Sequence, residues 1–433
     1  MKVAWFTPFT KKSAIGEYSK YAAEELSKYL DVDILVFETE NLYETNLHVI
    51  IYTQDNIKSI ILDYDLCIYN MGNYHPFHAS IFEVMKLRRG IIISHDLCLH
   101  DFFFGYYSHF VSNINMYKYS INKLYGKENA EKIFQATANV KQWASLDHSI
   151  YHMSQLLFPY CEGFFVHSKY HRFKLESLFA GPINNAWLPI PNKNESVINE
   201  RSNKMKFNLL TVGYVNPNKR IRSTIETIGK NKRLCENVHF ICVGSLENNE
   251  YAKELSQVIC DYKLESIVKL IGYVGNDKLL AYYNDADIII NLRYPALEGG
   301  SWSLAEQMQM GKIIIVSNTG VYSEIPDNCV IKIDPNNEIE DLTNSLLDII
   351  DNPEKFKQYG SNAKKFAEEE FSPSLYAKKL YDFIQHIVFL RPLNSLIDLI
   401  AQELRSFRVQ SEISICSAIS DEIESLFIVD QVK

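Results

Sequence analysis

Short runs of consecutive apolar residues alternate with longer segments in which apolar residues recur at helical spacing. In the first half of the chain, the runs predict strands and the longer segments predict helices at 17–30 and 81–87. Alternating strands and helices predict a parallel sheet covered on both faces, which is an α/β fold class. Ligands bind such sheets beyond the carboxyl ends of the strands. The predicted strands are 3–6, 32–37, 65–69, 91–94 and 163–168.

The second half repeats the alternation, with predicted strands at 207–212, 238–243, 267–271 and 286–290. Each of the first three strands is followed or closed by a glycine. Glycine lets a loop approach a ligand closely, so we expect these loops to crowd a bound molecule. A second α/β domain therefore follows the first. The three glycines are Gly213, Gly244 and Gly272.

Three parts of the chain depart from this alternation: a segment within the first domain, the segment between the two domains, and the end of the chain. Residues 102–160 are mostly helical in pattern and rich in aromatic residues, which we expect to pack in a core. Stacking on sugar rings or contact with a lipid is the alternative. The polar segment 192–206 predicts an interdomain linker. The helical pattern restarts at 376–384, and residues 390–433 predict two short helices that pack back. The expected divisions are 1–195, 206–370, 371–390 and 391–433.

Gly299 and Gly300 stand where a predicted strand gives way to a predicted helix. The backbone can approach a ligand closely there, and the unpaired N–H groups and the dipole of the helix favour an anion. Glu298 precedes this turn, and Glu306 lies two turns into the helix. A diphosphate would meet the N–H groups, and the two carboxylates would accept hydrogen bonds from sugar hydroxyls.

Composition narrows the class of protein. At 433 residues, with 47% hydrophobic residues, the chain is long enough for two buried cores and a tail. A net charge of −9 argues against nucleic acid as the main partner. The apolar runs are too short to span a bilayer, and the start of the chain resembles a strand rather than a signal peptide. The eight scattered cysteines fit reduced thiols in a cytoplasmic protein, and a peripheral membrane contact stays open.

Two Asp-x-Asp triplets raise the question of a metal site. Each triplet borders an apolar strand, an arrangement that is common where strands begin, so we favour a structural role. We expect no metal and no other cofactor. The triplets are Asp63-Tyr-Asp65 and Asp285-Ala-Asp287.

The spacing from Glu298 to Glu306, with the runs that follow at 311–320 and 324–327, resembles the signature of retaining glycosyltransferases of family 4. The segment Asn291-Leu-Arg-Tyr-Pro also resembles one subgroup of that family. The resemblance extends over most of residues 1–385 and is stronger in the second domain. It implies the GT-B fold, in which two Rossmann-like domains face each other and a C-terminal helix, here 371–390, crosses back onto the first.

For a nucleotide-sugar donor, the resemblance implies a site made largely by the second domain. Glu306 would bind the ribose hydroxyls, and Glu298 would face the hexose. Lys219 would offset the diphosphate charge that builds as the glycosidic bond breaks. A surface carboxylate for Glu306 and a solvated turn lysine for Lys219 are the structural alternatives. The other expected donor contacts are Gly299, Gly300, Ser301, Arg220, Arg293, Gly213, Gly272, Tyr273 and Val274.

In the first domain, His95 follows the end of a predicted strand. The resemblance implies that this histidine reaches the donor sugar, and a purely structural histidine is the alternative. With Glu298 and Lys219 it completes the predicted catalytic residues. The expected acceptor contacts are Gly16, His75, His100 and Asp101.

Two positions depart from the family pattern. The family usually places an arginine just after the glycine at 213, where this chain has Tyr214. Arg220, Arg222 or Arg293 would have to substitute for it. The family often has two adjacent glycines in the first loop, where this chain has Gly16 alone.

The hypothesis is therefore a cytoplasmic, metal-independent, retaining hexosyltransferase that uses a nucleotide diphosphate sugar. The acceptor would be a saccharide, or lipid-linked or protein-linked, in bacterial surface glycan assembly. No residue stands out as an enzymic nucleophile, which fits attack from the face that the leaving group quits. A non-catalytic glycosyltransferase-like binding subunit and a GT-B nucleotide-sugar epimerase remain alternatives. A dehydrogenase lacks support, because no Gly-x-Gly-x-x-Gly follows a predicted strand.

Overall fold

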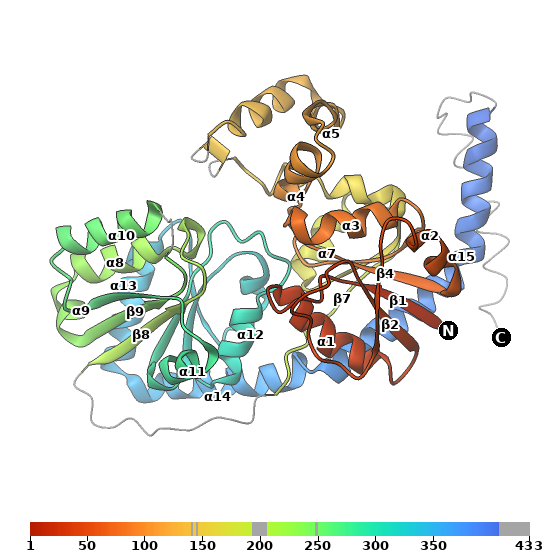
Figure 1. Cartoon of the computed structure of the whole chain (residues 1–433). Helices are drawn as coiled ribbons and strands as arrows, with labels where there is room; N and C mark the ends of the chain where they lie inside the picture. Colours follow the sequence, from red (N-terminus) through yellow and green to blue (C-terminus); the bar gives the residue numbers. More distant parts are fainter. Residues whose placement is uncertain (140–141, 144–145, 193–205, 247–249, 407–433) are drawn as a thin grey trace, which may run out of the picture. The chain divides into compact units, whose positions relative to one another are not determined.

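The structure, a computed structural model, describes residues 1–139, 142–143, 146–192, 206–246 and 250–406. The chain divides into two compact units, Met1–Tyr381 and Asp382–Lys433. The first unit contains two separate parallel sheets, one of seven strands and one of six (Figure 1). The predicted α/β fold class with two sheet domains is confirmed.

The first sheet has the strand order β3-β2-β1-β4-β5-β6-β7, and its neighbouring strands are all parallel. The five strands predicted from apolar runs all form. The sequence missed β3 and β7, which are short and only partly buried. The strands are β1 (Lys2–Phe6), β2 (Asp31–Val36), β3 (His48–Ile51), β4 (Leu66–Met71), β5 (Gly90–Ser94), β6 (Cys161–Val166) and β7 (Ile183–Asn185).

Helices connect these strands. The helix predicted from Ile81 begins earlier, at His75, because Pro76 stands in its first turn, where proline fits a helix. The helices and single turns are α1 (Ala14–Leu26), α2 (Ile57–Ile60), η1 (Ile61–Asp63), α3 (His75–Met85), α4 (His100–Gly105), η2 (Tyr106–Phe110), α5 (Ile114–Ala136), η3 (Ser154–Tyr160) and α7 (Lys169–Glu176).

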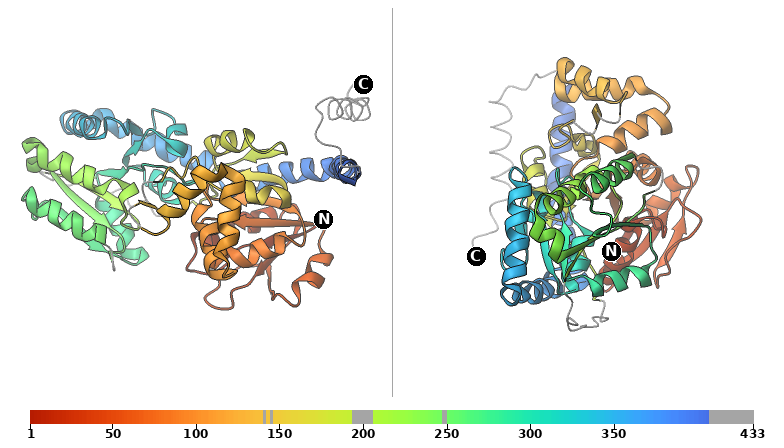
Figure 2. Two further views of the ribbon diagram at one scale, coloured as in Figure 1. Left: turned by 90° about the horizontal axis from the view of Figure 1, so that it is seen from above. Right: turned by 90° about the vertical axis from the view of Figure 1, so that its left-hand side faces the viewer.

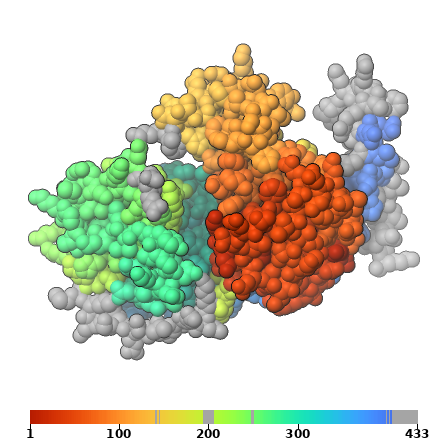
Figure 3. All heavy atoms as spheres, in the orientation of Figure 1, coloured from red at the N-terminus to blue at the C-terminus, as the bar shows by residue number. Residues whose placement is uncertain are grey.

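The aromatic region from α4 to η3 forms an orange-to-yellow lobe beside the red and orange surface of the first domain in Figure 3. Four of its rings are almost completely buried and belong to the same hydrophobic core as the buried residues of α3. Core packing is therefore the main role of this aromatic run, as predicted, although Phe110 and Tyr119 are exposed. The buried rings are Phe102, Phe103, Tyr106 and Tyr117.

The second sheet has the order β10-β9-β8-β11-β12-β13 and is also parallel throughout. Helices cover both of its faces (Figure 2). The short edge strand β13 was not predicted. The strands are β8 (Phe207–Val212), β9 (Val238–Val243), β10 (Val268–Gly272), β11 (Ile288–Asn291), β12 (Ile313–Ser317) and β13 (Ile331–Ile333). The helices and turns are η4 (Pro217–Lys219), α8 (Ile221–Lys230), α9 (Lys232–Asn237), α10 (Glu250–Asp261), α11 (Asn276–Asp285), α12 (Trp302–Gln309), η5 (Gly320–Glu324), α13 (Glu338–Asp351) and α14 (Pro353–Glu370).

The last described helix, α15 (Pro373–Ser406), is longer than the segment predicted at 376–384. It runs through residue 390 without a break, so the predicted division between a crossover helix at 371–390 and a separate first tail helix is wrong. At its start, the hydroxyl of Tyr376 contacts the hydroxyl of Tyr18 on α1, so the chain returns to the first domain there. Most of the predicted linker (193–205) and the second predicted tail helix (407–433) lie outside the described residues. Among the described residues, no helix is both long and apolar enough to cross a membrane.

Substituting Gly90 by alanine is expected to destabilise the first sheet. A Cβ at Gly90 would lie 2.2 Å from the carbonyl oxygen of Cys67 on β4, so the two strands would have to separate. We expect a loss of about 1–3 kcal/mol, from overpacking of a closely packed site. Thermal unfolding followed by circular dichroism measures it.

Gly275→Ala is the matched control, because a Cβ there meets no atom within 4 Å and the residue has an ordinary φ of −71°. Its stability should stay within about 0.5 kcal/mol of the wild type. Equal thermal unfolding midpoints for Gly90→Ala and Gly275→Ala would contradict the close packing of β5 against β4 at Gly90.

Candidate functional site

The turn between β11 and α12 carries unpaired backbone donors, as predicted. Ser301 caps α12, its Oγ accepting from the N–H of Leu304 at 3.3 Å. The N–H groups of residues 300–303 have no hydrogen-bond partner among the described residues. An anion placed here would meet several N–H groups and the positive end of the helix dipole.

Gly299 has a different role from the predicted one. Its N–H donates to the carbonyl oxygen of His95 at 2.9 Å, and a Cβ would lie 2.4 Å from Nδ1 of His171. Gly300 likewise has no room for a Cβ beside His167. The two glycines therefore let the first domain pack against this turn, and the N–H of Gly299 is already occupied. We leave Gly299 out of the site for an anion.

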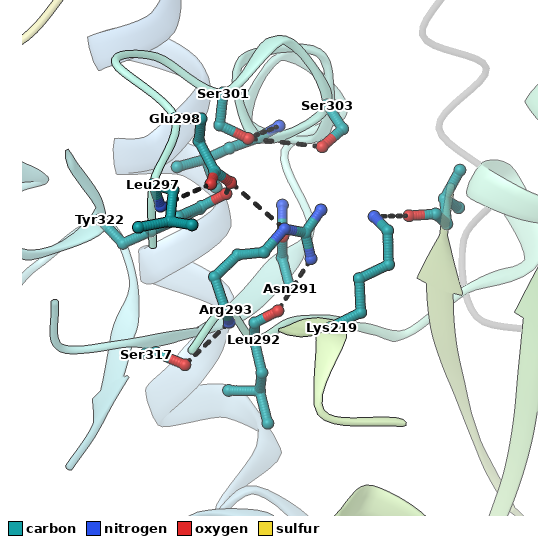
Figure 4. A network of polar contacts seen from close by, with 12 residues as sticks. Lys219, Asn291, Leu292, Arg293, Leu297, Glu298, Ser301, Ser303, Ser317 and Tyr322 are labelled. Carbon is teal, nitrogen blue, oxygen red and sulfur yellow. Dashed lines mark hydrogen bonds and ion pairs between the residues drawn. The ribbon is translucent and has the colours of Figure 1, made fainter. Parts of the chain in front are cut away.

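Glu298 is held by three groups of its own domain (Figure 4). The hydroxyl of Tyr322 donates to Oε1 at 2.5 Å, and Arg293 Nε lies 3.3 Å from the same oxygen. The N–H of Leu297 donates to Oε2 at 3.2 Å. About a quarter of the side chain is still exposed, at 23%. A carboxylate oxygen accepts more than one hydrogen bond, so Oε2 keeps capacity for a ligand hydroxyl.

Two buried cations lie beside this carboxylate. Lys219 Nζ donates to the carbonyl oxygen of Val212 at 3.0 Å, and Gly213, with φ of 109°, leaves the space that Nζ fills. Arg293 is 6% exposed, and its guanidinium lies between Glu298 and Lys219 in Figure 4. Burial, and then the charge of Arg293, lower the pKa of Lys219 to about 7.

Other predicted donor contacts are placed less favourably. Arg220 Nε donates to both oxygens of the buried Glu338 at 3.0 Å, so its guanidinium is committed to that carboxylate. Tyr214 is 58% exposed and Tyr273 is 81% exposed. Gly272, with φ of 83°, ends β10, as a tight strand exit requires.

Glu306 lines a cavity of about 420 Å³ that both domains border. The first domain contributes Glu17 of α1, and the second contributes residues of α11 and α12. A carboxylate and a tryptophan beside apolar side chains suit a polar ring with hydroxyl groups. The lining residues are Glu17, Asn276, Asp277, Leu279, Leu280, Tyr283, Trp302, Glu306 and Met310.

His95 stands at the end of β5, but both of its ring nitrogens face the protein. Asn70 Nδ2 donates to the carbonyl of Phe6 at 2.9 Å, so Asn70 Oδ1 faces Nε2 of His95 at 3.1 Å. The proton is therefore assigned to Nε2, and Nδ1 accepts from Nε2 of His167 at 3.1 Å. Burial lowers the pKa of His95 well below its usual range. In this arrangement His95 is a neutral residue that positions the turn through its carbonyl.

Of the four predicted acceptor residues, Asp101 and His75 are accessible to a ligand, and His100 and Gly16 are not. Asp101 is exposed and accepts hydrogen bonds from Asn73 Nδ2 at 2.9 Å and Trp143 Nε1 at 2.7 Å. His75 is half-buried at the start of α3.

His100 is fully buried, with Nε2 within 2.7 Å of the Tyr117 hydroxyl, so its predicted contact with an acceptor lacks access. Gly16 has no room for a Cβ, which would lie 2.7 Å from the carbonyl of Pro8, and therefore serves packing.

The structure adds residues that the sequence did not single out. Asp96 forms an antiparallel bridge with Glu298, and its Oδ2 accepts from the N–H of Asn73 at 2.8 Å. Burial, with the charges of Glu298 and Asp101, raises the pKa of Asp96 to about 7. The position of Asp96 directly after His95, at the end of a predicted strand, could have indicated it as a site residue. Nothing in the sequence near Tyr322 or Asn70 indicates a role in the site.

A second contact between the domains involves Glu324, at the end of η5. Its two carboxylate oxygens accept from the N–H groups of Lys169, at 2.9 Å, and Tyr170, at 2.5 Å, in the first turn of α7. A carboxylate at a helix N-terminus accepts hydrogen bonds from the free backbone N–H groups, and its negative charge is stabilised by the positive end of the helix dipole. Glu324 therefore joins the second domain to the first beside the glycine turn.

The two Asp-x-Asp triplets lie where strands begin. Asp65 Oδ2 accepts from the N–H of Lys2 at 2.7 Å, and Asp287 Oδ2 accepts from the N–H of Asn208 at 2.8 Å. Within the part of the chain that the structure describes, no group of three or more His, Cys, Asp or Glu residues is arranged to hold a metal ion.

Comparisons with known proteins bear on the family and on the fold of this chain. Residues 192–366 match the family model described as glycosyl transferases group 1. An uncharacterized glycosyltransferase of Methanocaldococcus jannaschii is 28% identical over 187 residues, which are 43% of this chain and 46% of that protein. The chain thus spans about half the length of this curated relative.

Solved structures show the same fold. HepE of Anabaena in complex with UDP matches with a TM-score of 0.61 at 14% identity, over 89% of this chain and 100% of that one. Sucrose-phosphate synthase of Thermosynechococcus elongatus matches with a TM-score of 0.60 at 13% identity, over 90% of this chain and 99% of that one. The GT-B fold expected from the sequence is confirmed.

The protonation of His95 can be tested directly. We expect a neutral ring with the proton on Nε2 from about pH 6 to 8, because burial and the neighbouring histidines disfavour the cation. Nitrogen NMR of histidine-labelled protein, assigned by comparison with His95→Gln, reports both ring nitrogens. A His95 signal that titrates with a midpoint near 6.5 would contradict the assigned network.

Proposed function

Because residues 192–366 match the family model of the group 1 glycosyl transferases and the chain has the GT-B fold, we propose that this protein transfers a hexose from a nucleotide diphosphate sugar to an acceptor. The acceptor is a saccharide, or lipid-linked or protein-linked. The proposed setting is bacterial surface glycan assembly, in the cytoplasm or at the inner face of the membrane. The transfer is proposed to retain the configuration at the anomeric carbon.

One observation carries this proposal. The unpaired N–H groups of residues 300–303 lie at the start of α12, with Glu298 on one side of the turn and Glu306 on the other. Lys219 and Glu298 belong to the same local cluster. A diphosphate needs the donors and the cation, and the sugar on each side of it needs the carboxylates.

The donor class also has support from related structures. HepE was solved with UDP, with UDP and glucose, and with UDP-glucose. Glu306, in the cavity bordered by both domains, suits ribose hydroxyls, and the partly exposed carboxylate of Glu298 suits a hexose hydroxyl. We assign no base, because Gly272 to Val274 would meet it through backbone atoms that do not distinguish one base from another.

The proposed mechanism uses charge that the chain itself supplies. As the glycosidic bond breaks, negative charge builds on the diphosphate, and protonated Lys219 and the N–H groups of α12 stabilise it. The route therefore requires no metal. The acceptor hydroxyl attacks from the face that the diphosphate leaves, and its proton passes to the departing phosphate oxygen. Asp101 and His75 are the first-domain candidates for holding the acceptor.

A non-catalytic binding subunit is the second candidate, and specific contacts favour it. The N–H of Gly299 is occupied by His95, and both ring nitrogens of His95 are held within the protein. A subunit that binds a nucleotide sugar or a partner without turnover would keep those contacts. Turnover of a donor by the wild-type protein would exclude it.

Removal of the two predicted donor contacts should separate binding from turnover. Glu306→Ala is expected to weaken binding of a nucleoside diphosphate about 10- to 100-fold, through loss of charge-assisted hydrogen bonds to ribose. Lys219→Ala is expected to lower kcat about 100-fold or more, because it removes charge stabilisation in the transition state. Calorimetry and a donor-turnover assay measure the two effects.

Glu340→Ala and Lys357→Ala are matched controls at exposed positions of α13 and α14. Both controls should behave like the wild type. If the Glu306→Ala variant and the Lys219→Ala variant both turn over the donor at the wild-type rate, the site assignment is rejected.

Stereochemistry tests the retaining character. With an α-linked donor, the first product is expected to be α-linked as well, because attack and departure share one face. Proton NMR of the anomeric signals, recorded early in the reaction, distinguishes the two outcomes. A β-linked first product would show that the transfer inverts.

A further inference from the structure

The second compact unit of the chain, Asp382–Lys433, contains most of α15. Near the start of this unit the helix is well packed, and Ile384 and Ile387 are fully buried. Beyond Ile387, large apolar side chains of the same helix are open to solvent. A single exposed leucine is ordinary, whereas a contiguous group of exposed apolar residues marks an interaction surface. The most exposed are Phe389 at 78%, Leu399 at 56% and Ile397 at 44%.

These exposed residues share one side of the helix. Successive residues of an α-helix are about 100° apart around its axis, so the apolar residues of 388–400 fall within one arc of about 200°. The polar residues Arg391, Asn394 and Ser395 lie together on the opposite side. No apolar residue of 388–400 is buried. We call the apolar residues of 388–400 the apolar arc of α15.

One neighbouring helix cannot cover an arc of this width. A helix that packs against one surface typically has an apolar stripe of about 100°, which is half the width of the apolar arc. Residues 407–433, which lie outside the described residues, follow α15 directly and have apolar residues at helical spacing. If they fold back as a helix, they cover one stripe, and about half of the arc still faces water.

A membrane surface is a poor match for the apolar arc. Residues 382–433 contain four Lys or Arg and eight Asp or Glu, a net charge of −4. Helices that lie on membranes have lysine and arginine on their polar side, which anionic lipids attract. Among the described residues, no helix is long and apolar enough to cross a bilayer. The charge of this unit therefore favours a protein partner.

A second copy of the chain is the protein partner that this geometry fits. Two identical segments bring two identical arcs together around a twofold axis, and dimers of this symmetry are the commonest oligomers. As a cylinder about 10 Å wide, the segment 388–406 is about 28 Å long and presents roughly 500 Å² on the side of the arc. Two copies together bury about 1,000 Å², the lower limit of a specific interface.

We propose that residues 388–406 pair with the same segment of a second copy of this chain, so that the protein is a symmetric, reversible dimer. Phe389, Leu396 and Ile400 lie at the middle of the apolar arc and form the centre of the interface. The inference goes beyond the proposed function and does not depend on it, because no residue of the donor site belongs to this segment.

Sedimentation velocity of the full-length protein tests the dimer. We expect the wild type to pass from monomer to dimer between about 1 and 100 μM, as suits a small interface. Phe389→Glu combined with Leu396→Glu is expected to raise the dissociation constant at least about 100-fold, because it places charges in the middle of the apolar arc. A wild type that stays monomeric over this whole range would overturn the proposal.

Two controls separate the apolar arc from general effects of substitution. Ser395→Glu adds a charge to the opposite side of the same helix, where Ser395 is exposed. Leu62→Glu removes an apolar side chain that is 78% exposed in the first compact unit. Both controls should dimerise like the wild type, and thermal unfolding shows that each variant is folded. Undiminished dimerisation of the double variant would place the interface elsewhere and overturn the proposal.

Photocrosslinking decides what covers the apolar arc. The photoreactive residue p-benzoylphenylalanine replaces Phe389 or, as the control, Ser395. We expect a covalent dimer from the first position, crosslinked to residues 388–406 of the second copy, and none from the control. Crosslinks confined to residues 407–433 of the same chain would overturn the proposal.

A vesicle assay tests the membrane as the alternative. We expect the wild type not to float with vesicles of phosphatidylcholine and phosphatidylglycerol, because the net charge of 382–433 is negative. Flotation of the wild type that the double variant loses would assign the apolar arc to a membrane and overturn the dimer.

Discussion

The central constraint on this structure is positive charge held in a buried place. Lys219 and Arg293 are both nearly inaccessible, and Glu298 is the carboxylate that contacts the arginine. Burial disfavours the charged form of Lys219 and lowers its pKa to about 7, and an anion bound beside Lys219 and Arg293 would favour the protonated form again. The N–H groups at the start of α12 point to the same kind of ligand. Gly213 leaves the space that Nζ of Lys219 fills, and the buried Tyr322 holds the Glu298 carboxylate that contacts Arg293.

Contacts between the two domains decide which groups remain available. The carbonyl of His95 takes the N–H of Gly299, and the N–H of Leu97 donates to the carbonyl of Leu297 at 3.2 Å. These bonds bring Asp96 beside Glu298. Glu324 adds a further contact through the first turn of α7. The glycine turn therefore has two functions: Gly299 and Gly300 leave room for the first domain, and the N–H groups of residues 300–303 stay available to a ligand.

The strands followed from the sequence because each buried strand is a run of apolar residues. The strands β3, β7 and β13 were missed, because they are edge strands of three or four residues, too short to give a distinct pattern. The strand β12 was expected only through the family resemblance of residues 311–320. The turn at Gly299 and Gly300 and the flanking Glu298 and Glu306 were also readable, because local spacing places them.

What the sequence could not supply were pairings between residues far apart in the chain. Tyr322 lies 24 positions from Glu298, and Asn70 lies 25 positions from His95. The burial of His100 and the commitment of Arg220 to Glu338 depend on packing in the same way. Spacing along the chain carries no information about such contacts.

The most direct measurement is a crystal structure of the protein with a bound nucleoside diphosphate. The account predicts the diphosphate at the start of α12, with its oxygens about 3 Å from Nζ of Lys219 and from N–H groups of residues 300–303. A diphosphate bound elsewhere, with Lys219 and the start of α12 still without a ligand, would contradict it.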